Sequence, residues 1–284
     1  MATAREIKRR IASVKNTQKI TRAMEMVASV KMRKARQQML NARPYAEKLF
    51  EIAGHLRSSM TAKLSPLLAS RTPRKINLVV VTSDKGLCGG FNAYVCRKAV
   101  EFIREHGTVE VLLTVIGKKG YQFFSRRQTA ILDSYPDVFV KPKYSDAAQA
   151  AGKVMNDFIS GTSDETWVIY NELVGTASQR TVLRKLLPVE PPQMEHKTTP
   201  EYIIEPDESA VVDVVLRKYQ LFQMWRIFLE SFAAEQASRM TAMHGATKNA
   251  GELITKLTLF YNKARQGAIT KELLEIVSGA EALQ

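Results

Sequence analysis

The residues best suited to chemistry lie in the segment Thr82–Asn92 (TSDKGLCGGFN), where three glycines and a cysteine separate a β-branched run from a helical pattern. A glycine-rich turn between a strand and a helix is where a phosphate-binding loop would lie. Gly86, Gly89 and Gly90 have neither the spacing of a Walker loop nor that of a dinucleotide fingerprint. We therefore expect a tight structural turn in which glycine supplies positive φ, with nucleotide binding as the alternative.

Cys88, in the same segment, could act as a nucleophile. No histidine precedes it within thirty residues to serve as its base, so we expect a small packed residue instead. Two cysteines in all are too few for a disulfide scaffold and are typical of a cytosolic protein. The histidines show no ligand spacing, so no metal site is indicated; they are His55, His106, His196 and His244.

The first 43 residues are strongly basic. They hold twelve Lys and Arg against Glu6 and Glu25, a net charge of +10 out of +14 for the chain. Nucleic acid and an acidic protein surface are both possible partners for such a segment. The first aromatic residue is Tyr45, so the aromatics that usually stack on single-stranded bases are missing. A cleavable transit peptide is a third reading, but the helical spacing continues for too long and serine is sparse.

The pattern along the chain predicts three segments. Residues 3–59 are helical, with Pro44 as a kink or joint, and the apolar face predicted for this helix is Ile7, Ile11, Val14, Ile20, Met24 and Val27. The middle alternates strands with helices, which predicts an α/β domain with a parallel or mixed sheet of about five strands. The expected strands are Ile76–Thr82, Glu110–Ile116, Thr129–Leu132, Thr166–Tyr170 and Tyr202–Glu205, and the expected helices are Ala93–His106, Lys118–Arg126 and Ser145–Ser160. The first of these strands is a continuous β-branched run, the pattern of a strand buried on both faces.

From about Asp207 to the end the chain is helical again, and its apolar and small residues advance by three or four in the heptad pattern of a coiled-coil seam. The predicted seam is Leu229, Phe232, Gln236, Met240, Met243, Thr247, Ala250, Ile254, Leu257, Tyr261, Ala264 and Ala268. Long helices at both ends of the chain predict an antiparallel coiled coil with an α/β domain between them. The predicted domains are residues 1–73, 74–208 and 209–284. Small seam residues and the internal glycines Gly245, Gly251 and Gly267 favour packing inside a sleeve of other subunits.

Three motifs carry a resemblance to a known family: Ile7–Lys34, Ser83–Asn92 and Ala237–Glu281 resemble the γ subunit of F-type ATP synthase, over the whole chain. The resemblance implies a central rotor that couples proton-driven c-ring rotation to ATP synthesis or hydrolysis in an α3β3 catalytic ring. It implies α, β and ε subunits and the c-ring as partners. It implies no cofactor and no catalytic residue of its own.

The resemblance also implies particular contacts and a location. Met24 would face an acidic lever segment of β, and Arg265 and Gln266, with Thr270, would contact a β loop. The stretch Leu187–Asp213 lacks the cysteines of a chloroplast-type thiol switch. Because the match begins near residue 3, we expect a bacterial source and a peripheral protein on the cytoplasmic face of the plasma membrane. The membrane would be reached through the c-ring. The rival function is a basic coiled-coil protein that binds nucleic acid.

Overall fold

The computed structural model describes residues 4–55, 65–175, 178–190, 205 and 207–281. Contacts divide the chain into two units, which we describe separately: unit 1 contains residues 1–28 and 240–284, and unit 2 contains residues 29–239. Two long helices contribute to both units, α1 (Ala4–His55) and α5 (Glu208–Glu281). The predicted boundaries after residues 73 and 208 stay predictions.

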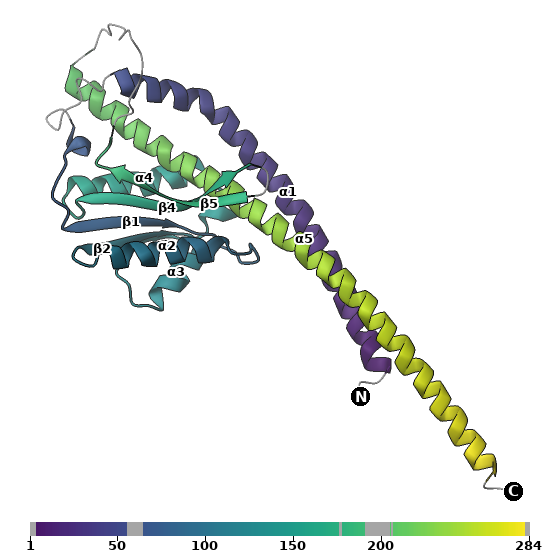
Figure 1. The fold of residues 1–284 in the computed structure, drawn as a ribbon. Coiled ribbons are helices and arrows are strands. Elements are labelled where there is room, and N and C mark those ends of the chain that lie inside the picture. Colours follow the sequence, from purple (N-terminus) through teal and green to yellow (C-terminus); the bar gives the residue numbers. More distant parts are fainter. Residues whose placement is uncertain (1–3, 56–64, 176–177, 191–204, 206, 282–284) are drawn as a thin grey trace. The chain divides into compact units, whose positions relative to one another are not determined.

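A five-stranded mixed sheet forms the centre of unit 2, in the order β3-β2-β1-β4-β5 (Figure 1). The inner strands pair in parallel, and β5 pairs antiparallel with β4. The strands are β1 (Lys75–Val81), β2 (Glu110–Ile116), β3 (Ile131–Tyr135), β4 (Glu165–Val174) and β5 (Ser178–Leu187). The remaining helices are α2 (Phe91–Glu105), α3 (Lys118–Ser125) and α4 (Tyr144–Ile159), with the short turns η2 (Pro66–Leu68) and η3 (Val138–Val140).

Both faces of the sheet are buried, as the β-branched run of β1 predicted. Leu78 and Val80 point into a core shared with α2 and α3, which includes Phe102 and Phe124. Val79 and Val81 belong to a larger core shared with α4 and with the unit 2 parts of α1 and α5. Within unit 2, α2 and α3 cover one side of the sheet and α4 and α5 the other (Figure 1). A strand buried on both faces loses the polar alternation of a surface strand, which is why its sequence is continuously apolar.

The predicted strands did not include β5, the fifth strand of the described sheet. Of the predicted strand Tyr202–Glu205, residues 202–204 lie outside the described residues, and Glu205 is not in a strand. The fifth strand is β5, whose sequence SQRTVLRKLL has no strict alternation and is rich in residues that favour helices. Pairing with β4 overrides that local preference, because the ladder from Val174–Ser178 to Thr166–Leu187 satisfies its backbone groups.

The other predicted elements are confirmed with small boundary shifts. Helix α1 is continuous through Pro44. Its described residues end at His55, so the rest of the predicted helical segment lies outside the described residues. Among the described residues, none of the helices combines the length and apolar character needed to cross a bilayer.

Candidate partner interface

The Thr82–Asn92 turn contains a carboxylate, that of Asp84, which is bound by backbone N–H groups. The Asp84 carboxylate accepts hydrogen bonds from the backbone N–H groups of Lys118, Asp137 and Phe139, at 2.9, 2.8 and 2.7 Å. Lys118 is the first residue of α3, so Asp84 fills the anion position at that helix N-terminus. A carboxylate in this position opposes the binding of a phosphate. Asp84 therefore has a structural role, in which it ties the turn to the start of α3 and to η3.

The glycines of this turn differ from the prediction in one respect. Of the three, Gly89 alone has a positive φ (56°), and Leu87 adopts the left-handed conformation as well (φ 62°). Gly90 lets the Tyr94 ring lie close to the backbone, since a Cβ there would be 2.7 Å from the ring and would make it move. Leu87 is exposed while its neighbour is buried, so the unusual backbone turns one side chain out and the next one in.

Cys88 is a packed residue, as predicted. It is buried with Phe91 and Ala234, and its Sγ lies 3.7 Å from the Ser83 Oγ. Burial raises the pKa of the Cys88 thiol above its ordinary value, and the nearby Glu235 adds to that rise. A thiol held protonated is a poor nucleophile. The described residues contain no cluster of ligands that could hold a metal ion.

Helix α5 fastens the turn within unit 2. Ser238 Oγ donates to the Cys88 carbonyl at 2.6 Å, and Arg239 donates to the carbonyls of Lys85 and Gly86 at 3.3 and 3.2 Å. Arg239 is itself held by Glu235, one helical turn away, at 2.6 Å. We call these contacts of Ser238 and Arg239 with the turn, together with the Glu235–Arg239 ion pair, the clamp. It was not predicted from the sequence. The i, i+4 spacing of Glu and Arg was visible, but nothing local tells which loop such a pair will face.

Glu235 has an unusual protonation equilibrium. Burial raises its pKa from 4.5 to about 7, with the charge of Asp84 acting in the same direction. Arg239, and more weakly Lys31 on α1, oppose the rise. One carboxylate oxygen, Oε2, is buried without a hydrogen-bond partner among the described groups. Desolvation outweighs the ion pair here because the side chain is almost completely enclosed.

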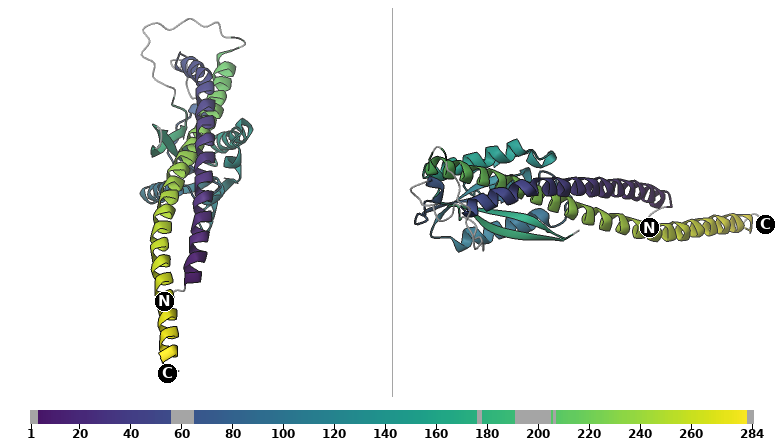
Figure 2. Two further views of the ribbon diagram at one scale, coloured as in Figure 1. Left: turned by 90° about the vertical axis from the view of Figure 1, so that its right-hand side faces the viewer. Right: turned by 90° about the horizontal axis from the view of Figure 1, so that it is seen from above.

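Unit 1 is an antiparallel pair of helices, in which the first part of α1 lies beside the second part of α5 (Figure 2). Polar contacts join the two helices at several points. The His244 Nδ1 lies 2.9 Å from the Glu25 carboxylate, and the Gln18 amide donates to the Thr247 carbonyl at 3.4 Å. Between them the hydroxyls of Thr21 and Thr247 are 2.8 Å apart. Polar contacts inside a seam cost stability but specify register, because any shift would leave them unpaired.

The predicted α5 seam is confirmed through Ala264. Seam residues from this stretch are buried or half-buried while most of their neighbours are exposed: Met243, Thr247, Ala250, Ile254, Leu257, Tyr261 and Ala264. Ala268, which the prediction included, is exposed. The described part of α1 begins at Ala4, so it offers no residues to pair with α5 beyond Ala264. Gly251 has a packing reason, since a Cβ there would lie 3.0 Å from the Gln18 Nε2.

The apolar face predicted for α1 was partly wrong. Ile20 and Val27 are 59% and 55% exposed. The seam instead continues from Val14 through Gln18, Thr21, Glu25 and Ala28, at steps of four and three. Choosing the most apolar residues selected the wrong face, because this seam is built from small and polar side chains. The outer face of unit 1 consequently carries apolar residues that the described part of the chain leaves exposed, a feature of partner-binding surfaces.

The four residues singled out by the resemblance fall into two groups. Met24 is half-buried in the paired part of unit 1. Arg265, Gln266 and Thr270 lie on a single exposed stretch of α5, where the Thr270 hydroxyl donates to the Gln266 carbonyl at 3.0 Å. The three residues lie within one six-residue stretch of α5. Met24 lies on the other helix, α1, and is not part of this stretch.

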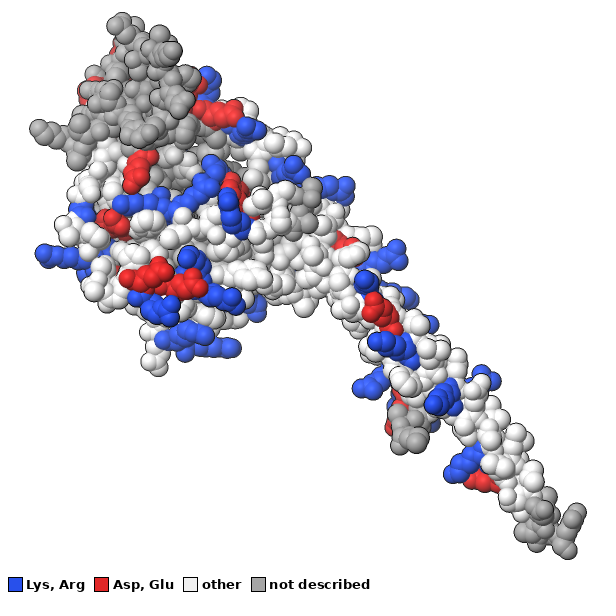
Figure 3. Space-filling view, in the orientation of Figure 1, with Lys and Arg blue, Asp and Glu red and all other residues white. Residues whose placement is uncertain are grey.

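Beyond the seam, every residue from Arg265 to Ser278 is exposed. The exposed set includes large apolar side chains: Ile269, Leu273, Leu274, Ile276 and Val277. Lys and Arg side chains lie along the visible face of the paired helices, and fewer Asp and Glu side chains lie between them (Figure 3). A surface that combines unpaired apolar side chains with an excess of positive charge favours a partner that offers apolar contacts and acidic groups.

Comparison with protein families gives one match, to a family model described as ATP synthase, over residues 3–283. Curated relatives match over the full length of both chains. The ATP synthase gamma chain of Geotalea daltonii is 46% identical over 287 residues, and that of Moorella thermoacetica is 44% identical over 284 residues. These matches give no support to the nucleic-acid-binding alternative.

Solved structures give the same result for the fold. A chain in the cryo-EM structure of the Tetrahymena thermophila mitochondrial ATP synthase central stalk and c-ring is 26% identical, with a TM-score of 0.61. The match covers 80% of this chain and 99% of that chain. A chain of the Euglena gracilis mitochondrial ATP synthase is 19% identical, with a TM-score of 0.69 over 99% of this chain and 94% of that chain. The long helix pair and the central sheet are therefore shared with central-stalk structures.

Proposed function

This chain belongs to the ATP synthase gamma chains, and we propose from that premise that it is the central rotor shaft of an F-type ATP synthase, coupling c-ring rotation to ATP synthesis or hydrolysis. The paired helices of unit 1 would turn inside an α3β3 catalytic ring. The asymmetry of their surface would drive the β subunits through different states in sequence. The observation that carries this proposal is the pairing itself: an antiparallel seam that leaves apolar and basic side chains facing outward.

The residues that would contact the ring lie at two levels of unit 1. Met24 would face an acidic lever segment of β, beside the basic side chains of α1. Arg265, Gln266 and Thr270 would meet a β loop, and the Arg265 guanidinium suits a bidentate contact with a carboxylate. Support comes from their exposure on one stretch of α5, where Arg265 forms no ion pair with any of the described residues.

The strength of such contacts suits a rotating part. Exposed ion pairs contribute about 0–1 kcal/mol each, so each can be exchanged for an equivalent one as the shaft turns. Apolar contacts at the exposed end of α5 are non-directional and allow sliding for the same reason. Together they would centre the helix pair without fixing it at one angle.

The remaining assignments follow from the same proposal. The chain would have no catalytic site of its own, and its α/β domain would meet the ε subunit and the c-ring. It would lie at the cytoplasmic face of a bacterial plasma membrane, as a peripheral subunit that reaches the membrane through the c-ring. The buried Cys88 and the occupied anion position at Asp84 support a structural role for the one motif that resembled a nucleotide loop.

Co-purification tests the proposal. Tagged full-length chain, produced together with untagged α and β subunits, is expected to bring down both in a complex that hydrolyses ATP. Arg265→Ala in that complex should lower the hydrolysis rate by about tenfold, the loss expected for one charge-assisted contact. Lys271→Ala is the control, since that exposed lysine is held by Glu275 on its own helix. A chain that brings down neither subunit but binds DNA with a steep salt dependence would refute the proposal.

A further inference from the structure

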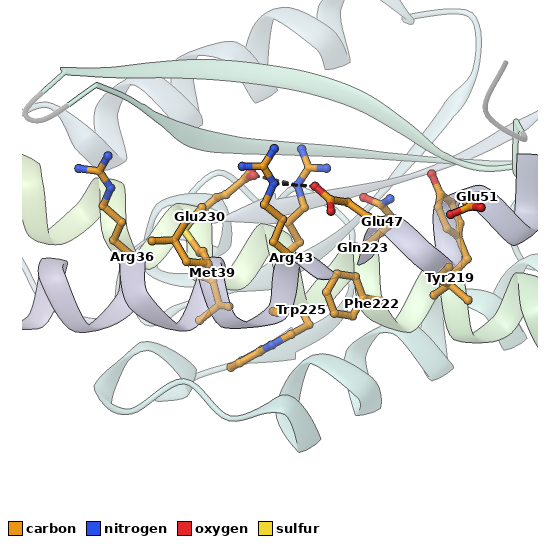
Figure 4. A pocket seen from close by; sticks show the side chains of 15 residues that line it. Arg36, Met39, Arg43, Glu47, Glu51, Tyr219, Phe222, Gln223, Trp225 and Glu230 are labelled. Atoms are coloured by element: carbon orange, nitrogen blue, oxygen red, sulfur yellow. Dashed lines mark hydrogen bonds and ion pairs between the residues drawn. The ribbon is translucent and has the colours of Figure 1, made fainter. Parts of the chain in front are cut away.

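A cavity of about 590 Å³ lies within unit 2, between α1 residues 36–51 and α5 residues 219–230. Its volume is in the range of pockets that hold small organic molecules. Side chains from both helices line it (Figure 4). The contacts with the α3β3 ring proposed above involve residues of unit 1, whereas this cavity is lined by residues of unit 2.

The cavity has an apolar lining that includes Met39 and Leu40 from α1 and Phe222, Trp225 and Leu229 from α5. Neighbouring rings hold the aromatic part in position. Phe222 packs against Tyr45 at 5.3 Å between ring centroids. Trp225 meets the edge of Tyr144 at 6.1 Å. Rings fixed in this way form a preorganised surface for an apolar body.

The carboxylates that line the cavity are already partnered. Glu47 binds Arg43 at 2.7 Å, and Glu51 binds Lys48 at 2.7 Å. Glu230 binds Arg226 at 2.8 Å. It also accepts from a buried tyrosine hydroxyl on β4 at 2.9 Å. The ion pairs therefore leave no lining carboxylate in need of a cation.

Arg36 is the exception among the charged lining residues. It is exposed on α1 and forms no ion pair or hydrogen bond with the described residues. Figure 4 shows its side chain at one end of the group, beside Met39. The cavity thus joins an apolar surface to one unpaired guanidinium.

We propose that this cavity binds an amphipathic organic monoanion, whose apolar body lies against Phe222 and Trp225 and whose anionic group pairs with Arg36. A dianion such as a phosphate ester suits it less, because the cavity offers one unpaired cation and three carboxylates. The ligand would touch α1 and α5 together, and so would stabilise unit 2 in proportion to its occupancy.

The chain contains two tryptophans, which gives a specific reporter. Trp167→Phe leaves Trp225 as the single tryptophan, and Trp167 lies on β4 outside the cavity lining. The probes are 8-anilinonaphthalene-1-sulfonate and N-phenyl-1-naphthylamine, which share one aromatic body and differ by the sulfonate. We expect the sulfonate to bind full-length chain with one-to-one stoichiometry, to quench Trp225, and to bind about tenfold more tightly than the uncharged amine.

Arg36→Gln should remove that tenfold preference and leave the binding of the uncharged amine unchanged. Arg33→Gln is the matched control, since it removes the same charge from an exposed position of α1 outside the cavity. Circular dichroism and melting temperature would verify that both variants fold. Equal affinity of the two probes, absence of Trp225 quenching, or an equal effect of the two arginine variants would each overturn the proposal. None of these results depends on assembly with α and β, so they leave the rotor proposal untouched.

Discussion

The sheet core of unit 2 and the seam of unit 1 are both buried, but they are built from different residues. The core contains fully buried aromatic and β-branched side chains such as Phe158, Phe228 and Val80. The seam contains threonine, glutamine, alanine and glycine, and its cross-helix contacts include a hydroxyl pair and a partly exposed histidine–glutamate contact. The core is expected to hold the chain folded, whereas the seam sets which faces of the two helices point outward.

The two regions should differ most in how much the free energy of unfolding falls when the same side chain, a phenylalanine ring, is removed from each. Phe158→Ala deletes a ring that is fully buried in unit 2 and should lower the free energy of unfolding by about 3–5 kcal/mol. Phe260→Ala removes the same ring from an exposed position of unit 1 and should change it by less than about 0.5 kcal/mol. Urea unfolding followed by circular dichroism measures both. Similar losses for the two variants would contradict the comparison.

The buried Glu235–Arg239 pair beneath the Thr82–Asn92 turn predicts a pH dependence of stability. Because the pKa of Glu235 is raised from 4.5 to about 7, the stability kept by its neutral form is fully present below pH 4.5 and is lost as pH rises through 7. Relative to Glu235→Gln, the natural chain should lose about 3 kcal/mol of stability between pH 4.5 and pH 8. Urea titrations at both pH values measure this difference.

Glu252→Gln provides the control for that titration, because Glu252 is an exposed carboxylate of α5 in unit 1. As a surface substitution, it should change the free energy of unfolding by less than about 0.5 kcal/mol. If the Glu235 and Glu252 variants gave the same pH profile, the assignment of the titration to Glu235 would be wrong.

A smaller effect should come from the polar seam itself. In a double-mutant cycle, Thr21→Val and Thr247→Val should be coupled by about 1 kcal/mol, the net value of one hydroxyl–hydroxyl hydrogen bond. The free energy of unfolding of each variant and of the pair supplies the coupling. Additive losses would show that the two hydroxyls do not interact across the seam.

The smallest expected effect is the difference in stability between two Gly→Ala variants of α5, one at a glycine with a close neighbour and one at a glycine without. Gly267→Ala meets nothing within 4 Å and should stabilise α5 by up to about 1 kcal/mol through helix propensity. Gly251→Ala should gain less, because the new methyl group would press against Gln18 at 3.0 Å. Melting temperatures of the two variants measure the difference, and an equal rise in both would remove the packing reason given for Gly251.

The two regions also differ in how much of them the sequence predicted. The apolar run of β1 identified a strand buried on both faces, and the heptads of α5 identified the seam through Ala264. Both are repeated local patterns that tertiary contacts reinforce. The clamp of Ser238 and Arg239 on the turn could not be predicted, because it joins groups about 150 positions apart.

Where local pattern and tertiary contact disagree, the prediction was wrong for a physical reason. β5 has the composition of an amphipathic helix and becomes a strand through its ladder with β4. Ile20 and Val27 are the most apolar residues of their stretch and still face outward, because the seam uses Gln18 and Thr21 instead. Such a mismatch is expected at a surface that serves a partner, since the chain's own packing does not choose those residues.

The central claim, that the outward face of unit 1 transmits rotation, is tested most directly by Met24→Lys in the membrane-bound enzyme. The new charge would lie beside the proposed acidic lever of β and bind it in place of sliding past it. ATP-driven proton pumping per ATP hydrolysed should fall, while Gln38→Lys, which adds the same charge to an exposed position of α1 in unit 2, should leave it unchanged. Full proton pumping by the Met24→Lys enzyme would contradict the account.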